Sequence, residues 1–272
     1  ATPPTVLCSV YSLEILYKRY ASNSRLSFLC VPLERSEKGM EFNMEINKYE
    51  KVLEDFIEKT KIRLNDRVKL ILLIGSFLSK KYINNWSDID LIIVVDKLDK
   101  EIFDDISEIS NNYGVKIGIT LYSEKEINNS LIDIKTTYYF YLYNLKNFNI
   151  PYINVNFKIP KISKELLLDR IKIGIFNDLH VCKRNLLYKD LNKNIARTQF
   201  KLIYNILKKC LILKDIYPLN YEETFIKATE EFNFYKFDYL KFIDDYAKDT
   251  IDYTKLKIIS INLINFIEKM EV

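Results

Sequence analysis

The chain has 272 residues, of which 48% are hydrophobic and 29% charged, and this composition supports a globular protein with a sizeable core. Its formal net charge is only +4 and charges of both signs are interspersed, so the composition does not indicate a nucleic-acid partner. No apolar run approaches the roughly 18 residues of a membrane span, which excludes a membrane-spanning protein.

The cysteines and the single histidine limit the possible chemistry. Cys8, Cys30, Cys182 and Cys210 form no CxxC pair, and their spacing matches no zinc site. We therefore expect reduced thiols and a cytoplasmic protein. His180 lies in a helical pattern and is expected to be an ordinary surface or partly buried residue, so a Ser–His–Asp or histidine–metal mechanism is not indicated.

The first 43 residues differ in composition from the rest of the chain. They contain no Asp, few Asn and Ile, and half of the cysteines. We expect residues 1–43 to be an atypical N-terminal segment without an assigned function, with the compact part of the protein beginning near Met44. Residues 46–66 carry apolar side chains at helical spacing and predict the first helix of that part.

Two predicted strands flank a polar loop. The apolar runs at 68–74 and 88–95 predict the strands, and Ser76 is expected to begin a short helix between them. Gly75 allows a sharp turn and the close approach of a ligand to the backbone. The free N–H groups and the positive dipole end of a helix beginning at Ser76 would attract phosphate.

Asp88 and Asp90 are two positions apart at the start of the second strand. Their carboxylates therefore point to one face, roughly 6–7 Å apart along the backbone. Like charges about 4 Å apart repel by about 4 kcal/mol at an effective dielectric near 20. A hard divalent cation with oxygen ligands, typically Mg²⁺, removes this penalty. A phosphate site facing a metal-binding carboxylate pair is the arrangement that phosphoryl or nucleotidyl transfer requires.

The pattern of these residues resembles the signature of the DNA polymerase β-type nucleotidyltransferases. The matching residues are Gly75-Ser76, a gap of 11 residues that ends in Ser87, and then Asp88-Ile89-Asp90-Leu91 between apolar strands. Within that superfamily the sequence is most similar to the bacterial small-molecule nucleotidyltransferases, including the aminoglycoside-modifying enzymes.

The resemblance implies ligands and a reaction. Asp88 and Asp90 would hold Mg²⁺, and Gly75, Ser76 and Ser87 would bind the NTP, with ATP favoured. The implied reaction transfers a nucleoside monophosphate to a hydroxyl of a small, aminoglycoside-like acceptor and releases pyrophosphate.

Two features depart from the family pattern. The family often has a glycine four residues after the serine, and here Lys80 stands in that place, either as a triphosphate ligand or as a solvated residue. The family usually carries a third carboxylate on the strand after the intervening helix. The predicted strand 115–122 instead presents Lys116, Gly118 and Thr120 on its polar face.

Three explanations of the missing carboxylate remain open. The base comes from the helical part, with Asp169 or Asp178 as candidates, or the enzyme uses a substrate amine or water as base, or catalysis has been lost. General-base assistance is worth about 10²–10⁴ in rate, so the difference matters. A protein without catalysis would be a nucleotide-binding or regulatory module, and modification of RNA or a protein is a further alternative.

The rest of the chain predicts more sheet and then helices. An amphipathic helix at 99–112 is expected to end at Gly114, a second helix is expected at 125–147, and residues 150–159 are extended. Five helices should follow, near 163–190, 194–214, 221–232, 236–248 and 253–270.

The predicted fold class is therefore α/β of the α+β kind. A small mixed sheet would form a nucleotidyltransferase domain at 44–160, and an all-helical bundle would follow at 161–272.

Overall fold

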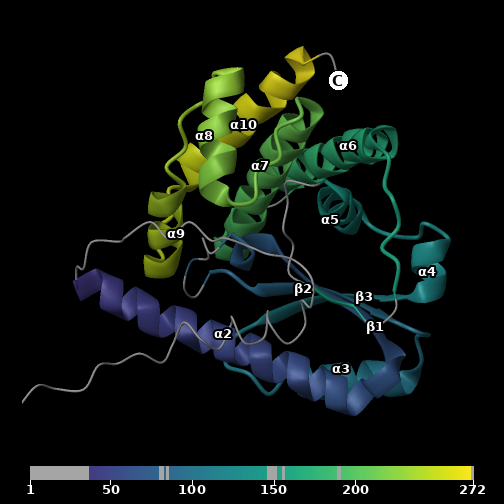
Figure 1. The fold of residues 1–272 in the computed structure, drawn as a ribbon. Coiled ribbons are helices and arrows are strands. Elements are labelled where there is room, and N and C mark those ends of the chain that lie inside the picture. The colour runs from purple at the N-terminus through teal and green to yellow at the C-terminus, as the bar shows by residue number, and fades with distance from the viewer. Residues whose placement is uncertain are drawn as a thin grey trace, which may run out of the picture. The chain divides into compact units, whose positions relative to one another are not determined.

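The computed structural model describes residues 37–79, 83, 86–145, 152–154, 157–188 and 191–270 (Figure 1). The chain divides into two units between Lys48 and Tyr49, and the sheet and the helices that follow α2 belong to the second unit. The predicted boundary at 43/44 lies inside helix α2 (Glu37–Leu64), whose backbone also crosses the 48/49 division. The predicted division of the remainder into 44–160 and 161–272 stays a prediction.

The sheet is mixed, as predicted. Its strands are β1 (Val68–Ile74), β2 (Ile89–Val95), β3 (Ile117–Ser123) and β4 (Tyr152–Asn154), in the order β3-β2-β1-β4. β1 pairs antiparallel with both β2 and β4, whereas β2 and β3 are parallel. The first two strands lie where the apolar runs predicted them and the third where 115–122 predicted it, and part of the extended stretch at 150–159 adds an edge strand.

Both faces of the two central strands are largely buried, and these strands are apolar except for Lys69 in β1 and Asp90 in β2. α3 (Lys100–Ser110) packs with Ile102, Ile106 and Ile109 buried, as its periodicity predicted. Figure 1 shows α3 on one side of the sheet and the C-terminal helices on the other.

Three local predictions were wrong, each because of a cap or turn. α3 ends at Ser110 with Asn111 in right-handed backbone, so Gly114 does not end the helix. The predicted helix at 125–147 is two helices, α4 (Glu124–Asn128) and α5 (Ile134–Asn144). A capping box begins α4, the side chain of Asp133 caps α5, and Ser130 between them has a positive φ.

The third wrong prediction concerns the segment after β1. Ser76 does not begin an α-helix, because residues Gly75–Phe77 form only a 3₁₀ turn. A helix dipole therefore does not contribute to phosphate binding there. Any contact between this turn and a ligand would depend on the backbone geometry of the turn.

The C-terminal half is helical, and all five predicted helices are present. They are α6 (Lys164–Tyr188), α7 (Lys193–Leu213), α8 (Tyr221–Phe232), α9 (Tyr239–Lys248) and α10 (Tyr253–Lys269). Side chains of Asn192, Asn220, Asp238 and Asp252 cap the last four. In the described residues, no helix is long and apolar enough to cross a membrane.

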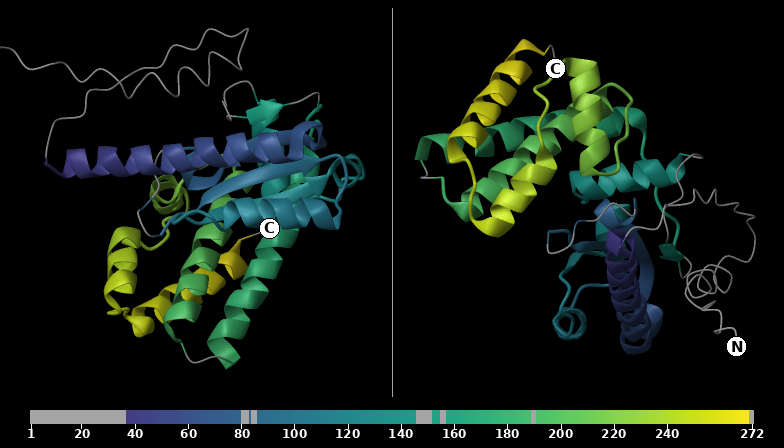
Figure 2. Two further views of the ribbon diagram at one scale, coloured as in Figure 1. Left: turned by 90° about the horizontal axis from the view of Figure 1, so that it is seen from below. Right: turned by 90° about the vertical axis from the view of Figure 1, so that its left-hand side faces the viewer.

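One continuous core joins the sheet to the helices. It runs from Leu72 and Ile92 on the sheet, through Phe140 on α5, to Phe200 and Ile203 on α7. In Figure 1 and the right view of Figure 2, α5 lies between the sheet and the bundle formed by α6 and α7. This arrangement brings residues of α5 and α7 to the end of the sheet where β1 ends and β2 begins.

Candidate active site

The register of the sheet places two glycines beside Asp90. Ile74 is the partner of Asp90 across β1 and β2, so Gly75 follows directly at this point. On the other side, Asp90 is the partner of Gly118 in β3. Asp90 therefore lies between the end of β1 and the start of β3.

Neither glycine can carry a side chain without disturbing this carboxylate. A β-carbon at Gly75 would lie 2.5 Å from Oδ2 of Asp90, and one at Gly118 would lie 2.9 Å from Oδ1. Gly75 also has φ +77°, which disfavours any residue with a β-carbon. The two glycines thus make room for the Asp90 carboxylate and expose backbone to a ligand beside it.

The turn that follows β1 is held in place by α5. The backbone N–H of Gly75 donates a hydrogen bond of 2.9 Å to the hydroxyl of Tyr139, which is buried on α5. The loop before β2 is also fixed locally, because the Ser87 hydroxyl accepts the N–H of Ile83 at 2.9 Å. Ser87 is therefore a structural hydroxyl of the loop as well as a residue near the carboxylates.

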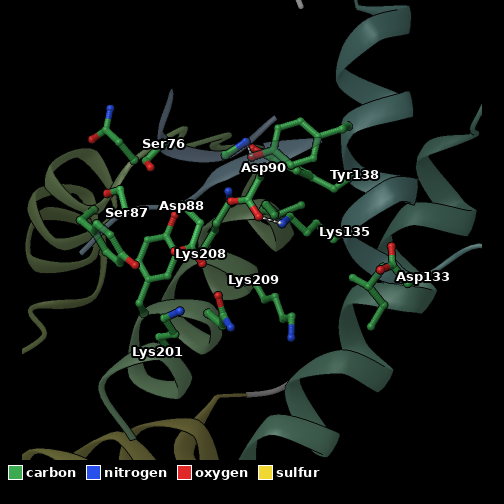
Figure 3. Close-up of a pocket in the computed structure, with 18 of the residues that line it drawn as sticks. Ser76, Ser87, Asp88, Asp90, Asp133, Lys135, Tyr138, Lys201, Lys208 and Lys209 are labelled. Carbon is green, nitrogen blue, oxygen red and sulfur yellow. Dashed lines mark hydrogen bonds and ion pairs between the residues drawn. The ribbon is translucent and has the colours of Figure 1, made fainter. Parts of the chain in front are cut away.

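A cavity of about 470 Å³ opens at this point, a volume typical of small-molecule sites. Five of the predicted site residues line it together, namely Gly75, Ser76, Ser87, Asp88 and Asp90 (Figure 3). Lys80, the fourth predicted nucleotide-binding residue, which could instead be a solvated lysine, lies outside the described residues.

Each carboxylate of the pair carries a lysine partner. The Lys116 ammonium lies 2.7 Å from Oδ2 of Asp88, and the Lys135 ammonium lies 2.9 Å from Oδ1 of Asp90. Lys135 belongs to the first turn of α5 and lines the cavity, whereas Lys116 precedes β3 and is not among the residues that line it. The two ion pairs balance the charge of two neighbouring acids.

A polar stripe on α7 forms the opposite wall. The stripe consists of residues at helical spacing, namely Lys201, Tyr204, Asn205, Lys208, Lys209 and Ile212. Figure 3 shows its lysines opposite the strand end that carries Asp88 and Asp90. Lys209 is already bound, because its ammonium contacts Asp178 at 2.5 Å and the carbonyl of Gly174 at 3.2 Å.

Lys201 and Lys208 differ from Lys209. In the described part of the chain neither forms an ion pair with a carboxylate. Burial lowers the pKa of Lys201, and the nearby Arg197 lowers it further. Burial lowers the pKa of Lys208 to about 7, with repulsion from Lys135 as the next cause. The charged form of each lysine therefore lacks a paired counter-ion, and an anionic ligand in the cavity would supply one.

The rings of three tyrosines surround Lys208. Its ammonium lies 4.7 Å from the ring centroid of Tyr138, 5.6 Å from that of Tyr139 and 5.9 Å from that of Tyr204. These cation–π contacts hold the ammonium at the cavity wall without neutralising its charge.

The carboxylates proposed from sequence as the base are not cavity residues. Asp169 is exposed on α6, and Asp178 contacts Lys209 but does not line the cavity. The third carboxylate of the cavity is Asp133, the cap of α5, whose Oδ1 accepts the N–H of Thr136 at 2.6 Å. In Figure 3 it lies beyond Lys135 as seen from Asp90.

The donor set fits a Mg²⁺ ion that is shared with a phosphate ligand. In the described ranges, no group of three or more His, Cys, Asp or Glu residues could hold a metal, so Asp133 does not join the pair as a third ligand. Mg²⁺ is commonly bound by one or two carboxylates together with substrate phosphates and water. Asp88 and Asp90 would supply those carboxylates, and both residues line the cavity.

The mixed sheet followed by a helical bundle is similar in fold to a solved adenyltransferase. A solved structure that matches is spectinomycin adenyltransferase AAD(9) from Enterococcus faecialis, crystallised with ATP and spectinomycin. The TM-score is 0.56 at 15% sequence identity, and the match covers 82% of this chain and 100% of that chain. A scan against protein-family models found no match, and a search of curated proteins found none either.

Proposed function

We propose that the protein transfers a nucleoside monophosphate from an NTP, with ATP as the favoured donor, to a hydroxyl of a small molecule in a Mg²⁺-dependent reaction. One observation carries this proposal. A single cavity brings together the Gly75–Phe77 turn, the Asp88/Asp90 pair and the lysines of α7. Fold likeness to a nucleotidyltransferase that was crystallised with ATP supports the same reaction class.

The triphosphate would lie between the two walls of the cavity. Lys201 and Lys208 are seven residues apart on one helix, which corresponds to about 10 Å along its axis. This length suits a chain of phosphates better than a single one. The backbone turn at Gly75 would approach the phosphates from the other side, where no side chain intervenes.

The reaction would be an in-line displacement at the α-phosphorus. Bound Mg²⁺ would supply charge neutralisation and a template for the phosphates. Asp88 and Asp90 would orient the α-phosphate toward the acceptor, and Lys201 and Lys208 would stabilise the charge that develops on the pyrophosphate leaving group. The acceptor oxygen forms the new bond to phosphorus, the bond to the bridging oxygen of pyrophosphate breaks, and the hydroxyl proton passes to a base.

Asp133 is the carboxylate of the cavity that remains for the acceptor. Its Oδ1 holds the start of α5, so Oδ2 would accept a hydrogen bond from an acceptor hydroxyl, and the group would serve as the base. The acceptor itself would be a hydroxylated small molecule of aminoglycoside-like size, as the 470 Å³ cavity admits.

Binding and turnover would be measured separately. Calorimetry should detect ATP binding that is tighter with Mg²⁺ than in EDTA. Pyrophosphate release should then be screened against spectinomycin, other aminoglycosides and neutral cyclitols. The proposal fails if neither ATP nor another NTP binds, or if binding is independent of Asp88 and Asp90.

The base would be identified by three matched substitutions. Asp133→Asn keeps a side chain that caps helices well and removes only the acid. If Asp133 is the base, this change should lower kcat by about 10²–10⁴ and leave nucleotide affinity unchanged. Asp169→Asn and Asp178→Asn test the two carboxylates of the helical half in the same assay.

A non-catalytic nucleotide-binding protein is the second candidate. It is favoured by the absence of any three-carboxylate metal group in the described residues. Tight binding of Mg-ATP without pyrophosphate release for any acceptor tested would support this candidate.

A further inference from the structure

Lys135 occupies a position between two competing partners. Its ammonium is bound to Asp90 at 2.9 Å, and Asp90 is a proposed ligand of Mg²⁺. The positive charge of Lys135 is also one of the causes that lower the pKa of Lys208. Both lysines line the same cavity, one from α5 and the other from α7.

We propose that Lys135 exchanges partners during ligand binding, leaving Asp90 when the metal binds and pairing with a phosphate of the nucleotide instead. Metal and nucleotide would then bind cooperatively. This inference rests on the proposed function.

The first half of the exchange follows from competition for one carboxylate. Asp90 lies between Gly75 and Gly118, which restricts the directions from which its oxygens can be approached. Direct coordination of Mg²⁺ at about 2.0–2.1 Å places a dication where the Lys135 ammonium now acts. Two cations on one carboxylate repel, so a metal bound at Asp90 weakens the Lys135–Asp90 ion pair and favours its separation.

The second half follows from the surroundings of Lys135 after its release. The ammonium would remain beside Lys208, which forms no ion pair with a carboxylate in the described residues. Two neighbouring ammonium groups without a counter-ion are unfavourable, and a phosphate group between them would remove the repulsion. Nucleotide binding thus offsets the loss of the ion pair, and this offset is the source of the cooperativity.

Lys116 provides a matched control within the same site. It forms an equivalent ion pair with the neighbouring acid Asp88, at 2.7 Å. Unlike Lys135, it is not a residue that lines the cavity, and its side chain is 70% exposed. Lys116 should therefore compete with the metal but should not bind the nucleotide.

The test uses the full chain and its Lys135→Met, Lys116→Met and Lys135→Arg variants. Three affinities are measured for each protein: Mn²⁺ alone by electron paramagnetic resonance, a non-hydrolysable ATP analogue in EDTA, and the same analogue at saturating Mn²⁺. Association of Mn²⁺ with the analogue in solution is common to all four proteins and cancels in the comparison. Thermal unfolding checks that each variant is folded.

Lys135→Met is expected to change the affinities for Mn²⁺ and for the analogue in opposite directions. Mn²⁺ alone should bind roughly two- to fivefold more tightly than to the wild type, the range for removal of a part-exposed ion pair. The analogue with Mn²⁺ should bind roughly ten- to a hundredfold more weakly, because a charged hydrogen bond to phosphate is lost. Lys116→Met should tighten Mn²⁺ binding and leave the analogue unchanged, and Lys135→Arg should behave as the wild type.

Two kinds of failure are distinguishable. If the wild type binds the metal and the analogue, but Lys135→Met weakens both, changes neither, or matches Lys116→Met in analogue affinity, the partner exchange is wrong and the proposed function stands. If the wild type binds neither ligand, or if Asp90→Asn binds both as well as the wild type does, the proposed function and this inference are both wrong.

Discussion

Gly118 lies directly against Asp90, so that a β-carbon at position 118 would come within 2.9 Å of Oδ1. The position on β3 that faces the proposed metal ligand therefore has no room for any side chain. This explains in physical terms why a third carboxylate does not stand on this strand beside Asp90. A carboxylate there would collide with Asp90 before it could share a metal with it.

The contact predicts the effect of Gly118→Ala. The added methyl group must displace the Asp90 carboxylate, so Mg²⁺ or Mn²⁺ affinity should fall, and overpacking should lower the free energy of unfolding by about 1–3 kcal/mol. Metal titration and thermal unfolding measure the two effects. Gly114→Ala is the control, because a β-carbon there has no neighbour within 4 Å. Equal effects of the two substitutions would contradict the prediction.

Asp88→Asn and Asp90→Asn should abolish metal-dependent nucleotide binding while leaving the fold intact. Each change removes a charged oxygen ligand but keeps the size of the side chain. The ion pairs with Lys116 and Lys135 are part-exposed, and such pairs are worth about 0–1 kcal/mol, so the melting temperature should change little. Calorimetry with Mg-ATP measures the loss, and Asp169→Asn serves as an exposed control. A double variant that binds Mg-ATP like the wild type would refute the assignment.

Tyr139→Phe should loosen the turn after β1. It removes the acceptor of the Gly75 N–H, and an unsatisfied buried donor costs about 1–3 kcal/mol of stability. Nucleotide affinity should fall as well, because the turn faces the cavity. Tyr138→Phe is the matched control, since it removes a buried hydrogen bond of 3.2 Å to the carbonyl of Pro218 and keeps the ring beside Lys208. That variant should lose comparable stability with nucleotide affinity retained, as chemical unfolding and calorimetry can establish.

Nucleotide binding should take up a proton at pH 8. Lys208 has a pKa of about 7 in the free protein, so most of it is neutral at that pH. Phosphate favours the ammonium form and raises its pKa, and affinity should therefore fall as pH rises from about 7 to 9. Calorimetry in two buffers of different ionisation enthalpy counts the proton. Lys208→Arg stays charged throughout, so it should show no uptake and a flat pH profile over this window. Identical uptake by both proteins would exclude Lys208 as the titrating group.

Sequence periodicity predicted most of the fold. Strands at 68–74 and 88–95 follow from continuous apolar runs and the five C-terminal helices from helical spacing, and both patterns reflect burial. The break between α4 and α5 was missed because the apolar pattern continues across it. The signals were local, in the Ser123 and Asp133 caps, and a run of helix-compatible residues concealed them.

The candidate site was predictable on one side only. Gly75, Ser76, Asp88 and Asp90 lie close together in the chain, and their spacing alone brought them together. Lys135 depends on a tertiary contact that no local pattern reveals. The lysines of α7 did leave a signal, since Lys201 and Lys208 share one face of a helix that is otherwise largely buried, but a lysine on a helix is ordinarily solvated.

The order of the cavity residues along the chain has a consequence for synthesis on the ribosome. The turn and both aspartates belong to the first hundred residues, whereas the α7 lysines and Tyr221 come about a hundred residues later. A nascent chain whose sheet alone has left the ribosome carries the two carboxylates and the lysines that pair with them, but not the lysines of α7. On the proposed function, the protein would become able to hold a triphosphate only late in translation, and a chain truncated before α7 should not compete for the cell's nucleotides.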